Sequence, residues 1–330
     1  MNPTRKSLLL AVVLFCSCQP CKSQDMQMDR MRDEHANYWL KWDTAQERMI
    51  AYGNSSDPSA PAGRIFGRDG HSVAIYPLRD LAESASVNLW DAAATPEGGM
   101  ILAGIVGYGP PESHLQTKSV LLTYSPVGKL EKVWNVAPYE FDLVAVDGQG
   151  NVYGLGNADL EEPYDILVKY SPEGKVLKQF LSTSLFSVGA HILSPGGGTK
   201  GLNQMFIQDQ VLFVWFARTE ELLRFSLSGD LLNRASLANS LKELAAANGD
   251  DGIVLRSLAP SGGDQVIVEV VLWDTRTATT SARPILVELS PNGPSAAPLP
   301  FDMHSNRFLG KSSTGKLVLL ERSSGIVRTY

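Results

Sequence analysis

Charged and amide side chains recur at one position of a repeated strand–turn–strand unit, and together they could bind a ligand. Asp91 and Asp142 each lie eight residues before a turn glycine, Gly99 and Gly150 respectively. Other copies of the unit carry polar residues at or near the same point, namely Asn203, Arg256 and Arg307. Buried charges are tolerated only when they are paired. This mixed set therefore indicates either a site for a polar or zwitterionic small ligand or a ring of internal ion pairs.

Groups that could catalyse a reaction are sparse in this chain. His304 lies shortly before the strand of Arg307, and His114 and His191 lie in loops between strands. No two histidines have the His-x-His or His-x-x-x-His spacing of a metal site. The chain has no Gly-x-Ser-x-Gly motif and no cysteine after Cys21, so the usual nucleophile motifs are missing. The sequence leaves open whether the protein is an enzyme.

A hairpin with an aromatic-Ser-x-x-Gly turn is the first of two units that position these residues. Serine can bond the backbone two residues on, proline presets φ, and glycine accepts the positive φ before the return strand. We therefore predict a β-hairpin in each copy. The copies are LLTYSPVGKL at 121–130, LVKYSPEGKV at 167–176, LLRFSLSGDL at 222–231 and, with leucine in place of the aromatic residue, LVELSPNGPS at 286–295.

The second unit is a strand, a turn and another strand, and it alternates with the first. Its apolar runs of four to eight residues are rich in Val, Ile and Leu, which favours strands over helices. The two units together predict a four-stranded sheet that repeats at intervals of roughly 50 to 60 residues. Five copies of the second unit cover residues 91–106, 142–157, 203–217, 255–270 and 307–322.

Radial stacking of these sheets predicts a single all-β domain, a β-propeller with five or six four-stranded blades. A lone sheet cannot cover both of its faces, whereas in a propeller each blade covers the next. Five inner hairpins are evident, and a degenerate sixth could lie in residues 35–90 or 181–202. The C-terminal run GIVRTY lacks a fourth strand, which HSVAIYPL at residues 71–78 could supply. A β-sandwich is the alternative.

The repeats resemble those of a known family. The alternation of DLVAVDGQGNVYGL with ILVKYSPEGKVL is similar to that of NHL/YVTN-type propellers, which are akin to the six-bladed TolB-like and gluconolactonase-like group. The resemblance covers roughly residues 64–330 and implies six blades. It is specific for architecture rather than for function, because function depends on the site and not on the fold.

The resemblance also bears on cofactors and catalysis. Propeller lactonases of this kind use a Glu, Asn and Asp set around the axis, and Asp91, Asp142 and Asn203 could mimic part of it as calcium ligands. Arg256 and Arg307 would repel a cation, so we predict no metal and no cofactor, with calcium as the alternative. Propeller lyases draw catalytic histidines from separate blades, as His114, His191 and His304 could be drawn here.

The N-terminus predicts export. Arg5 and Lys6 precede an unbroken apolar run, LLLAVVLF at 8–15, which matches a secretory signal peptide and is too short to span a bilayer. The segment FCSC at 15–18 resembles a bacterial lipoprotein box in which Cys18 would carry the lipid. Cleavage near Ser23 is the alternative, and it would leave no cysteine in the mature chain. We expect a signal segment of one of these types over residues 1–23.

Residues 24–63 are predicted to be a tether or linker before a propeller domain of residues 64–330. Trp39, Trp42 and Met49 recur at helical intervals, which favours a helix over 29–49. The run NSSDPSAPAG at 54–63 is typical of a linker. Within the domain, LANSLKELAAA at 237–247 predicts a short inserted helix that ends at Gly249.

Composition favours an exported binding protein. The chain has 35 acidic and 29 basic residues and a formal net charge of −6, which argues against nucleic acid as a partner. We expect a binding module for a peptide, a glycan or a partner protein in the periplasm, the cell envelope or the extracellular space. It would contact the membrane only through a lipid at Cys18. A hydrolase or lyase with its site at the central channel is the alternative function.

Overall fold

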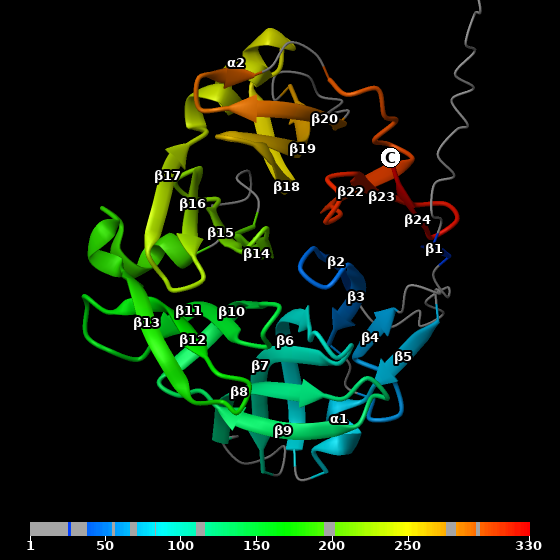
Figure 1. The fold of residues 1–330 in the computed structure, drawn as a ribbon, viewed down its shortest axis with the longest axis vertical. Helices are drawn as coiled ribbons and strands as arrows, with labels where there is room; N and C mark the ends of the chain where they lie inside the picture. The colour runs from blue at the N-terminus through cyan, green and yellow to red at the C-terminus, as the bar shows by residue number, and fades with distance from the viewer. Residues whose placement is uncertain are drawn as a thin grey trace, which may run out of the picture.

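Six four-stranded antiparallel sheets form a ring in the computed structural model of the protein (Figure 1). The structure describes residues 26–27, 38–54, 57–66, 71–82, 84–109, 116–194, 202–274, 282–294 and 298–330. In each sheet the strands lie side by side from the axis of the ring to its rim. The protein is therefore a six-bladed β-propeller, which agrees with the five or six blades predicted from the repeats and with the six implied by the family resemblance.

The first half of the ring consists of blades 1 to 3, each made of four consecutive strands. Blade 1 contains β2 (Tyr38–Asp43), β3 (Arg48–Gly53), β4 (Gly63–Phe66) and β5 (Ser72–Ile75). Blade 2 contains β6 (Ser84–Ala94), β7 (Met100–Tyr108), β8 (Gln116–Tyr124) and β9 (Leu130–Asn135). Blade 3 contains β10 (Tyr139–Val146), β11 (Val152–Ala158), β12 (Asp165–Tyr170) and β13 (Val176–Ser182).

The second half consists of blades 4 to 6. Blade 4 contains β14 (Gln204–Gln208), β15 (Val211–Phe216), β16 (Glu221–Ser226) and β17 (Leu231–Ser236). Blade 5 contains β18 (Gly252–Gly262), β19 (Gln265–Trp273), β20 (Arg283–Ser290) and β21 (Gly293–Pro294). Blade 6 contains β22 (Asn306–Lys311), β23 (Leu317–Glu321), β24 (Ile326–Thr329) and β1 (Met26–Gln27).

The two ends of the chain meet in blade 6. Its outer strand β1 pairs with β24, so that Met26 lies opposite Val327 and Gln27 opposite Ile326. The sequence analysis predicted this kind of closure but assigned the wrong segment, because residues 72–75 form β5 and pair with β4 in blade 1. The short strand before residue 28 was missed since two residues carry no detectable periodicity.

The predicted tether contains the inner half of blade 1. Trp42 and Met49 face each other across the β2–β3 ladder and are both buried, so the helix predicted over 29–49 is wrong in its described part. A turn at residues 44–47 reverses the chain, and Glu47 adopts a φ of 50°, which a right-handed helix excludes. Burial against blade 6 overrides the local helical spacing. The domain therefore begins before residue 64, and the predicted linker at 54–63 joins β3 to β4.

The hairpin turns and the inserted helix agree with the sequence prediction. In blade 2 the Ser125 hydroxyl accepts the Lys129 N–H at 3.1 Å, and Gly128 adopts a φ of 76°. Helix α2 (Ala238–Ala247) ends just before Gly249, whose φ is 75°. Its Leu241 and Leu244 pack among the apolar residues of blades 4 and 5. The other helical segments are short, namely α1 (Pro77–Asp80), η1 (Thr183–Leu185) and η2 (Gly189–Leu193).

Apolar side chains between neighbouring blades form the core. Phe180 of blade 3 meets Phe225 of blade 4 edge to face, with their ring centroids 5.5 Å apart. Trp42 and Phe66 of blade 1 share one cluster with Val318 of blade 6, so the same packing continues across the junction of the chain ends. This packing holds the six inner strands around one axis (Figure 1).

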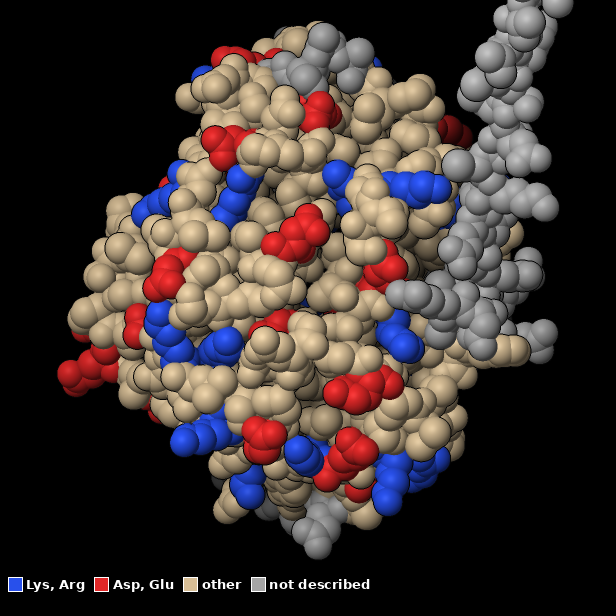
Figure 2. Space-filling model, in the orientation of Figure 1, with Lys and Arg blue, Asp and Glu red and all other residues tan. Residues whose placement is uncertain are grey.

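The predicted signal segment, including Cys18, lies outside the described residues. Among the residues that the structure does describe, no helix is both long and apolar enough to cross a membrane. Acidic and basic side chains are interspersed on the face drawn in Figure 2, and groups of both signs border the middle of the ring.

Candidate functional site

Equivalent bulges in three inner strands define one level of the ring. Each bulge leaves one residue without a ladder partner. Beside each bulge, a residue of the blade's second strand pairs with a leucine of its third strand. These leucines are Leu121, Leu167 and Leu286, and each lies four residues before the serine of the outer turn of its blade. The three bulges are therefore equivalent. The bulged residues are Trp90 between the pairs of Leu89 and Asp91, Asp142 between those of Phe141 and Leu143, and Arg256 between those of Leu255 and Ser257.

In blade 2, the position of the bulge shows that the alignment of the repeats on their turn glycines is wrong by one residue. Gly98, with a φ of 93°, takes the left-handed turn position that Gly150, with a φ of 81°, takes in blade 3. The alignment used the adjacent Gly99, because two glycines occur in a row. Trp90 is therefore the equivalent of Asp142, and Asp91 lies one position further along its strand. Sequence reasoning missed Trp90 for this reason.

Asp91 is a buried cross-link between three blades. Its Oδ2 accepts from the Lys41 Nζ of blade 1 at 2.6 Å and from the Val144 N–H of blade 3 at 2.8 Å. Its Oδ1 accepts from the Tyr52 hydroxyl at 3.0 Å, and Lys41 also donates to the Val144 carbonyl at 2.9 Å. Only 1 % of Asp91 is exposed. Both carboxylate oxygens are engaged by the protein, so the geometry favours the internal ion-pair interpretation at this residue.

Glu269 is a second buried carboxylate, on β19 of blade 5, and sequence reasoning did not single it out. Its Oε2 accepts from the Phe308 N–H of blade 6 at 2.8 Å, while its buried Oε1 has no hydrogen-bond partner. Guanidinium nitrogens of Arg256 and Arg322 lie 3.7 Å from Oε1, beyond hydrogen-bonding distance. Burial raises the pKa of Glu269, and the Phe308 N–H and the nearby arginines offset this only in part.

Three arginines surround Glu269, and we call Arg256, Arg307 and Arg322 the arginine cluster. The side chains of Arg256 and Arg322 are 47 % and 42 % exposed. Burial lowers the pKa of Arg307, and the charge of Glu269 raises it. Arg322 donates its Nε–H to the Asn306 carbonyl at 3.2 Å, and the described residues offer the guanidiniums of Arg256 and Arg307 no hydrogen-bond acceptor within bonding distance. Three cations thus face one carboxylate with most of their donors free.

A pocket of about 210 Å³ opens beside the arginine cluster, between blades 5 and 6. His304 contributes to its wall, as do Met303 and Pro284. The structure therefore brings together three of the predicted site residues, because Arg256 and His304 line this pocket and Arg307 interacts with the same glutamate. Arg322, which the sequence analysis missed, completes the cationic side of the pocket.

Asp142 lies across the ring from the arginine cluster, on blade 3 (Figure 1). Burial, with contributions from the charges of Glu140 and Asp91, raises the pKa of Asp142 to about 6. Its charge is therefore only partly formed near pH 6, and a nearby cation would favour the ionised form. The side chain is half-buried.

Asn203 has a structural role. Its Nδ2 donates to the Leu193 carbonyl at 2.9 Å, and its Oδ1 accepts from the Ala217 N–H at 2.9 Å. His191 lies exposed in η2, on blade 3's connection to blade 4, and His114 lies outside the described residues. The described histidines are therefore not assembled as a catalytic set.

Two of the three side chains proposed as calcium ligands are engaged by the protein itself. Asp91 and Asn203 use their oxygens in the hydrogen bonds given above. Over the described ranges, no group of three or more His, Cys, Asp or Glu side chains is close enough to hold a metal ion.

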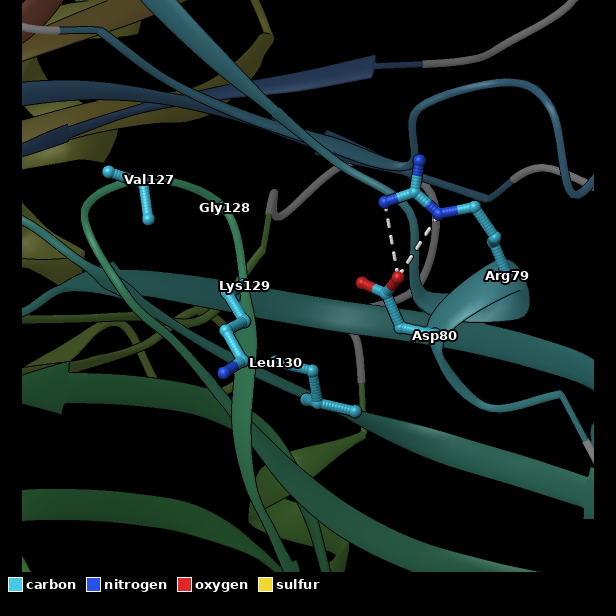
Figure 3. A pocket seen from close by; sticks show the side chains of 6 residues that line it. All are labelled: Arg79, Asp80, Val127, Gly128, Lys129 and Leu130. Atoms are coloured by element: carbon cyan, nitrogen blue, oxygen red, sulfur yellow. Dashed lines mark hydrogen bonds and ion pairs between the residues drawn. The ribbon is translucent and has the colours of Figure 1, made fainter.

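A wider hollow of about 430 Å³ lies between α1 and the outer turn of blade 2 (Figure 3). Arg79 and Asp80 pair with each other at 3.1 Å on one side, and Val127, Gly128, Lys129 and Leu130 form the other. No predicted site residue lies in it. Arg79 and Asp80 neutralise each other, which leaves Lys129 as the single unbalanced charge among its lining residues, whereas two arginines line the pocket between blades 5 and 6.

Comparison with known proteins adds no closer identification. No family model matches the chain, and no curated protein matches it. Among solved structures, it is similar to a streptogramin B lyase with 8 % identity and a TM-score of 0.45, over 93 % of this chain and 86 % of that one. It is also similar to a protein of unknown function from Bacteroides caccae, with 13 % identity, a TM-score of 0.41 and coverage of 81 % and 82 %.

A third similar structure is a glucose dehydrogenase, with 12 % identity and a TM-score of 0.43, over 93 % of this chain and 98 % of that one. Scores this low place no functional residue. The assignment of the fold rests on the strand pairing of this chain itself.

Proposed function

We propose that the protein is an exported binding module whose ligand carries an anionic group, held by the arginine cluster at the pocket between blades 5 and 6. The observation that carries this proposal is the imbalance of charge around Glu269, where three guanidiniums face one buried carboxylate. A pocket with a net positive charge and free planar donors suits a carboxylate or phosphate group.

The distances around Glu269 support a role in binding rather than in stability alone. A structural pair would place a guanidinium within hydrogen-bonding distance of Oε1, as Arg283 does with Asp250 at 2.6 Å in the same blade. Arg256 and Arg322 instead stop at 3.7 Å and remain close to half exposed. Glu269 would orient the two arginines, and an anionic ligand would take the donors that Glu269 leaves free.

Export of the protein is part of this proposal. The cations and apolar run at residues 5–15 support a signal segment, and Cys18 would carry a lipid if the segment is of the lipoprotein type. The ligand would then be an extracellular or envelope molecule, such as a peptide or a glycan with an acidic group.

Isothermal titration with inorganic phosphate and with propionate tests the anion site. The double variant Arg256→Gln/Arg322→Gln should weaken binding of both probes at least tenfold, because each lost charge-assisted contact is worth about 1.5–3 kcal/mol. Arg283→Gln, which removes an arginine of similar exposure from the outer part of blade 5, is the control and should bind like the wild type. Equal affinities of the wild type and the double variant would refute the proposal.

A hydrolase or lyase with its site at the channel is the second candidate. It is favoured by Asp142, a half-buried carboxyl at the inner level of the ring whose pKa of about 6 suits proton transfer near neutral pH. Turnover of a lactone or aryl-ester probe that is lost in Asp142→Asn and retained in Glu140→Gln would support this activity. Absence of turnover in the wild type would leave the binding function alone.

A further inference from the structure

The pocket between blades 5 and 6 has two walls of different chemistry. Arg256 and Arg322 form its cationic side. Its other lining residues apart from His304 are apolar, namely Val271, Ala282, Pro284 and Met303. Val271 and Met303 are only 3 % and 2 % exposed, so this wall belongs to the buried layer between the two blades. The pocket therefore combines a positive charge with an apolar wall.

The apolar wall begins next to the carboxylate that the two arginines share. Alternate residues of a strand point to the same side, so Val271 lies on the same face of β19 as Glu269. Val271 also pairs with Pro284 in the β19–β20 ladder. Met303 packs in the apolar cluster that includes Ile267, two residues before Glu269 on that strand. A group bound at the arginines thus lies beside apolar side chains, where water screens its charge less.

The size of the pocket limits what it can hold. A water molecule occupies about 30 Å³ in the liquid, so 210 Å³ corresponds to the space of roughly seven non-hydrogen atoms. This is less than the space that a drug-sized ligand fills. The pocket therefore has room for a carboxylate and about four further carbon atoms, as a whole small acid or as one end of a larger molecule.

The charge at the pocket matches a single carboxylate. Of the arginine cluster, only Arg256 and Arg322 line the pocket, and both lie 3.7 Å from Oε1 of Glu269, which leaves one net positive charge. The charge of His304, when present, is balanced by Asp302, which accepts the His304 backbone N–H at 3.0 Å. A carboxylate supplies one negative charge and two acceptor oxygens, one for each guanidinium. Glu269 would repel a doubly charged phosphate more strongly.

We infer that the pocket binds a carboxylate that carries a short apolar group, with the carboxylate at the two arginines and the apolar group against Val271, Pro284 and Met303. This inference rests on the proposed function for the anionic end and adds the apolar end. The same chemistry occurs in small aliphatic acids and at the C-terminus of a peptide whose last residue is apolar.

Isothermal titration of the protein with straight-chain acids from acetate to heptanoate tests the apolar end. We expect the affinity to rise about fourfold with each added methylene until the pocket is filled, at roughly the length of pentanoate, and then to level off. Inorganic phosphate, which has no apolar part, should bind no more tightly than acetate. Equal affinities for acids of all lengths would overturn the apolar end. Tighter binding of phosphate than of every acid would overturn the choice of a carboxylate.

Val271→Ala separates binding at the wall from a general effect on the fold. It enlarges the pocket, so the affinity should go on rising for about one or two methylenes beyond the length at which the wild type levels off. Val270→Ala, on the opposite face of the same strand, is the matched control and should level off with the wild type. If Val271→Ala does not fold, Pro284→Ser at a half-buried position should reduce the gain per methylene and leave acetate bound as before. Wild-type length dependence in the folded wall variant would contradict the inference.

The same titrations separate this inference from the proposed function. Arg256→Gln/Arg322→Gln should weaken acids of every length by the same factor, because it removes only the anionic end. If acetate binds through the arginines and longer acids bind no better, the apolar end is wrong and the anion site stands. If no acid and no phosphate binds, both proposals fail.

N-acetylleucine and 4-methylpentanoate distinguish the two sources of such a carboxylate. Both carry the same carboxylate and apolar group, and the acetamido group of N-acetylleucine represents the preceding peptide unit. Tighter binding of N-acetylleucine would support the inference with a peptide C-terminus as the source, and tighter binding of 4-methylpentanoate would support it with a free aliphatic acid. If neither compound binds better than acetate, the inference is wrong.

Discussion

Two buried carboxylates, Asp91 and Glu269, lie in similar places and differ in what completes them. Each accepts a backbone N–H from the inner strand of the next blade, from Val144 for Asp91 and from Phe308 for Glu269. Asp91 has an ammonium group and a hydroxyl for its remaining acceptor sites, whereas Oε1 of Glu269 has no hydrogen bond. Burial alone therefore does not reveal a site. The distinguishing property is whether the protein itself satisfies the buried charge.

The largest effect is expected when Asp91 is removed. Asp91→Ala would leave Lys41 and the buried Tyr52 hydroxyl without their acceptor and the Val144 N–H unpaired, and should cost about 3–5 kcal/mol of the free energy of unfolding. Denaturant unfolding measures this loss. Asp230→Ala, which removes a carboxylate from an exposed turn, is the control and should lower stability far less than Asp91→Ala, because solvent screens its ion pair with Lys178. Equal losses in the two variants would contradict the structural role of Asp91.

Glu269→Gln tests the other buried carboxylate, for which we expect a small change in stability and a gain in anion binding. The amide oxygen can still accept the Phe308 N–H, and the change removes the one negative charge within the arginine cluster. The free energy of unfolding should change by about 1 kcal/mol or less, because no hydrogen bond to Oε1 is lost. Affinity for inorganic phosphate should rise roughly fivefold, on the order of 1 kcal/mol. A loss of stability as large as that of Asp91→Ala would show that Glu269 is structural too.

A smaller effect is expected from the titration of Asp142. Its folded pKa of about 6 lies above its ordinary value of 3.8, so the folded state binds a proton that the unfolded state has released between these pH values. Stability should therefore fall as pH rises from about 4 to about 6, by on the order of 1 kcal/mol once partial exposure is allowed for. Unfolding measured across this range should show a weaker slope in Asp142→Asn. An unchanged slope would assign the titration to another group.

The sequence was sufficient for the fold and for part of the site. Repeated Ser-x-x-Gly turns and alternating apolar runs predicted the blades, since these signals are local. Blade 1 was recognised only as a place where a copy could hide, because a four-residue β4 and a long β3–β4 connection obscure the repeat. Arg256, Arg307 and His304 were found from the repeat. Glu269 and Arg322 were not, since both lie on or after second strands and their proximity follows from packing between blades.

The outer strand of blade 6 also bears on how the ring closes. Bringing together residues about 300 positions apart costs roughly 5 kcal/mol of chain entropy. Two ladder pairs cannot supply that free energy. The junction of blades 1 and 6 offers more, with Trp42 donating to the Lys311 carbonyl at 3.1 Å, Glu47 accepting the Ser313 N–H at 2.7 Å, and a shared apolar cluster. Closure of the ring therefore depends mainly on the contacts between blades 1 and 6, and the two pairs of β1 add a smaller contribution.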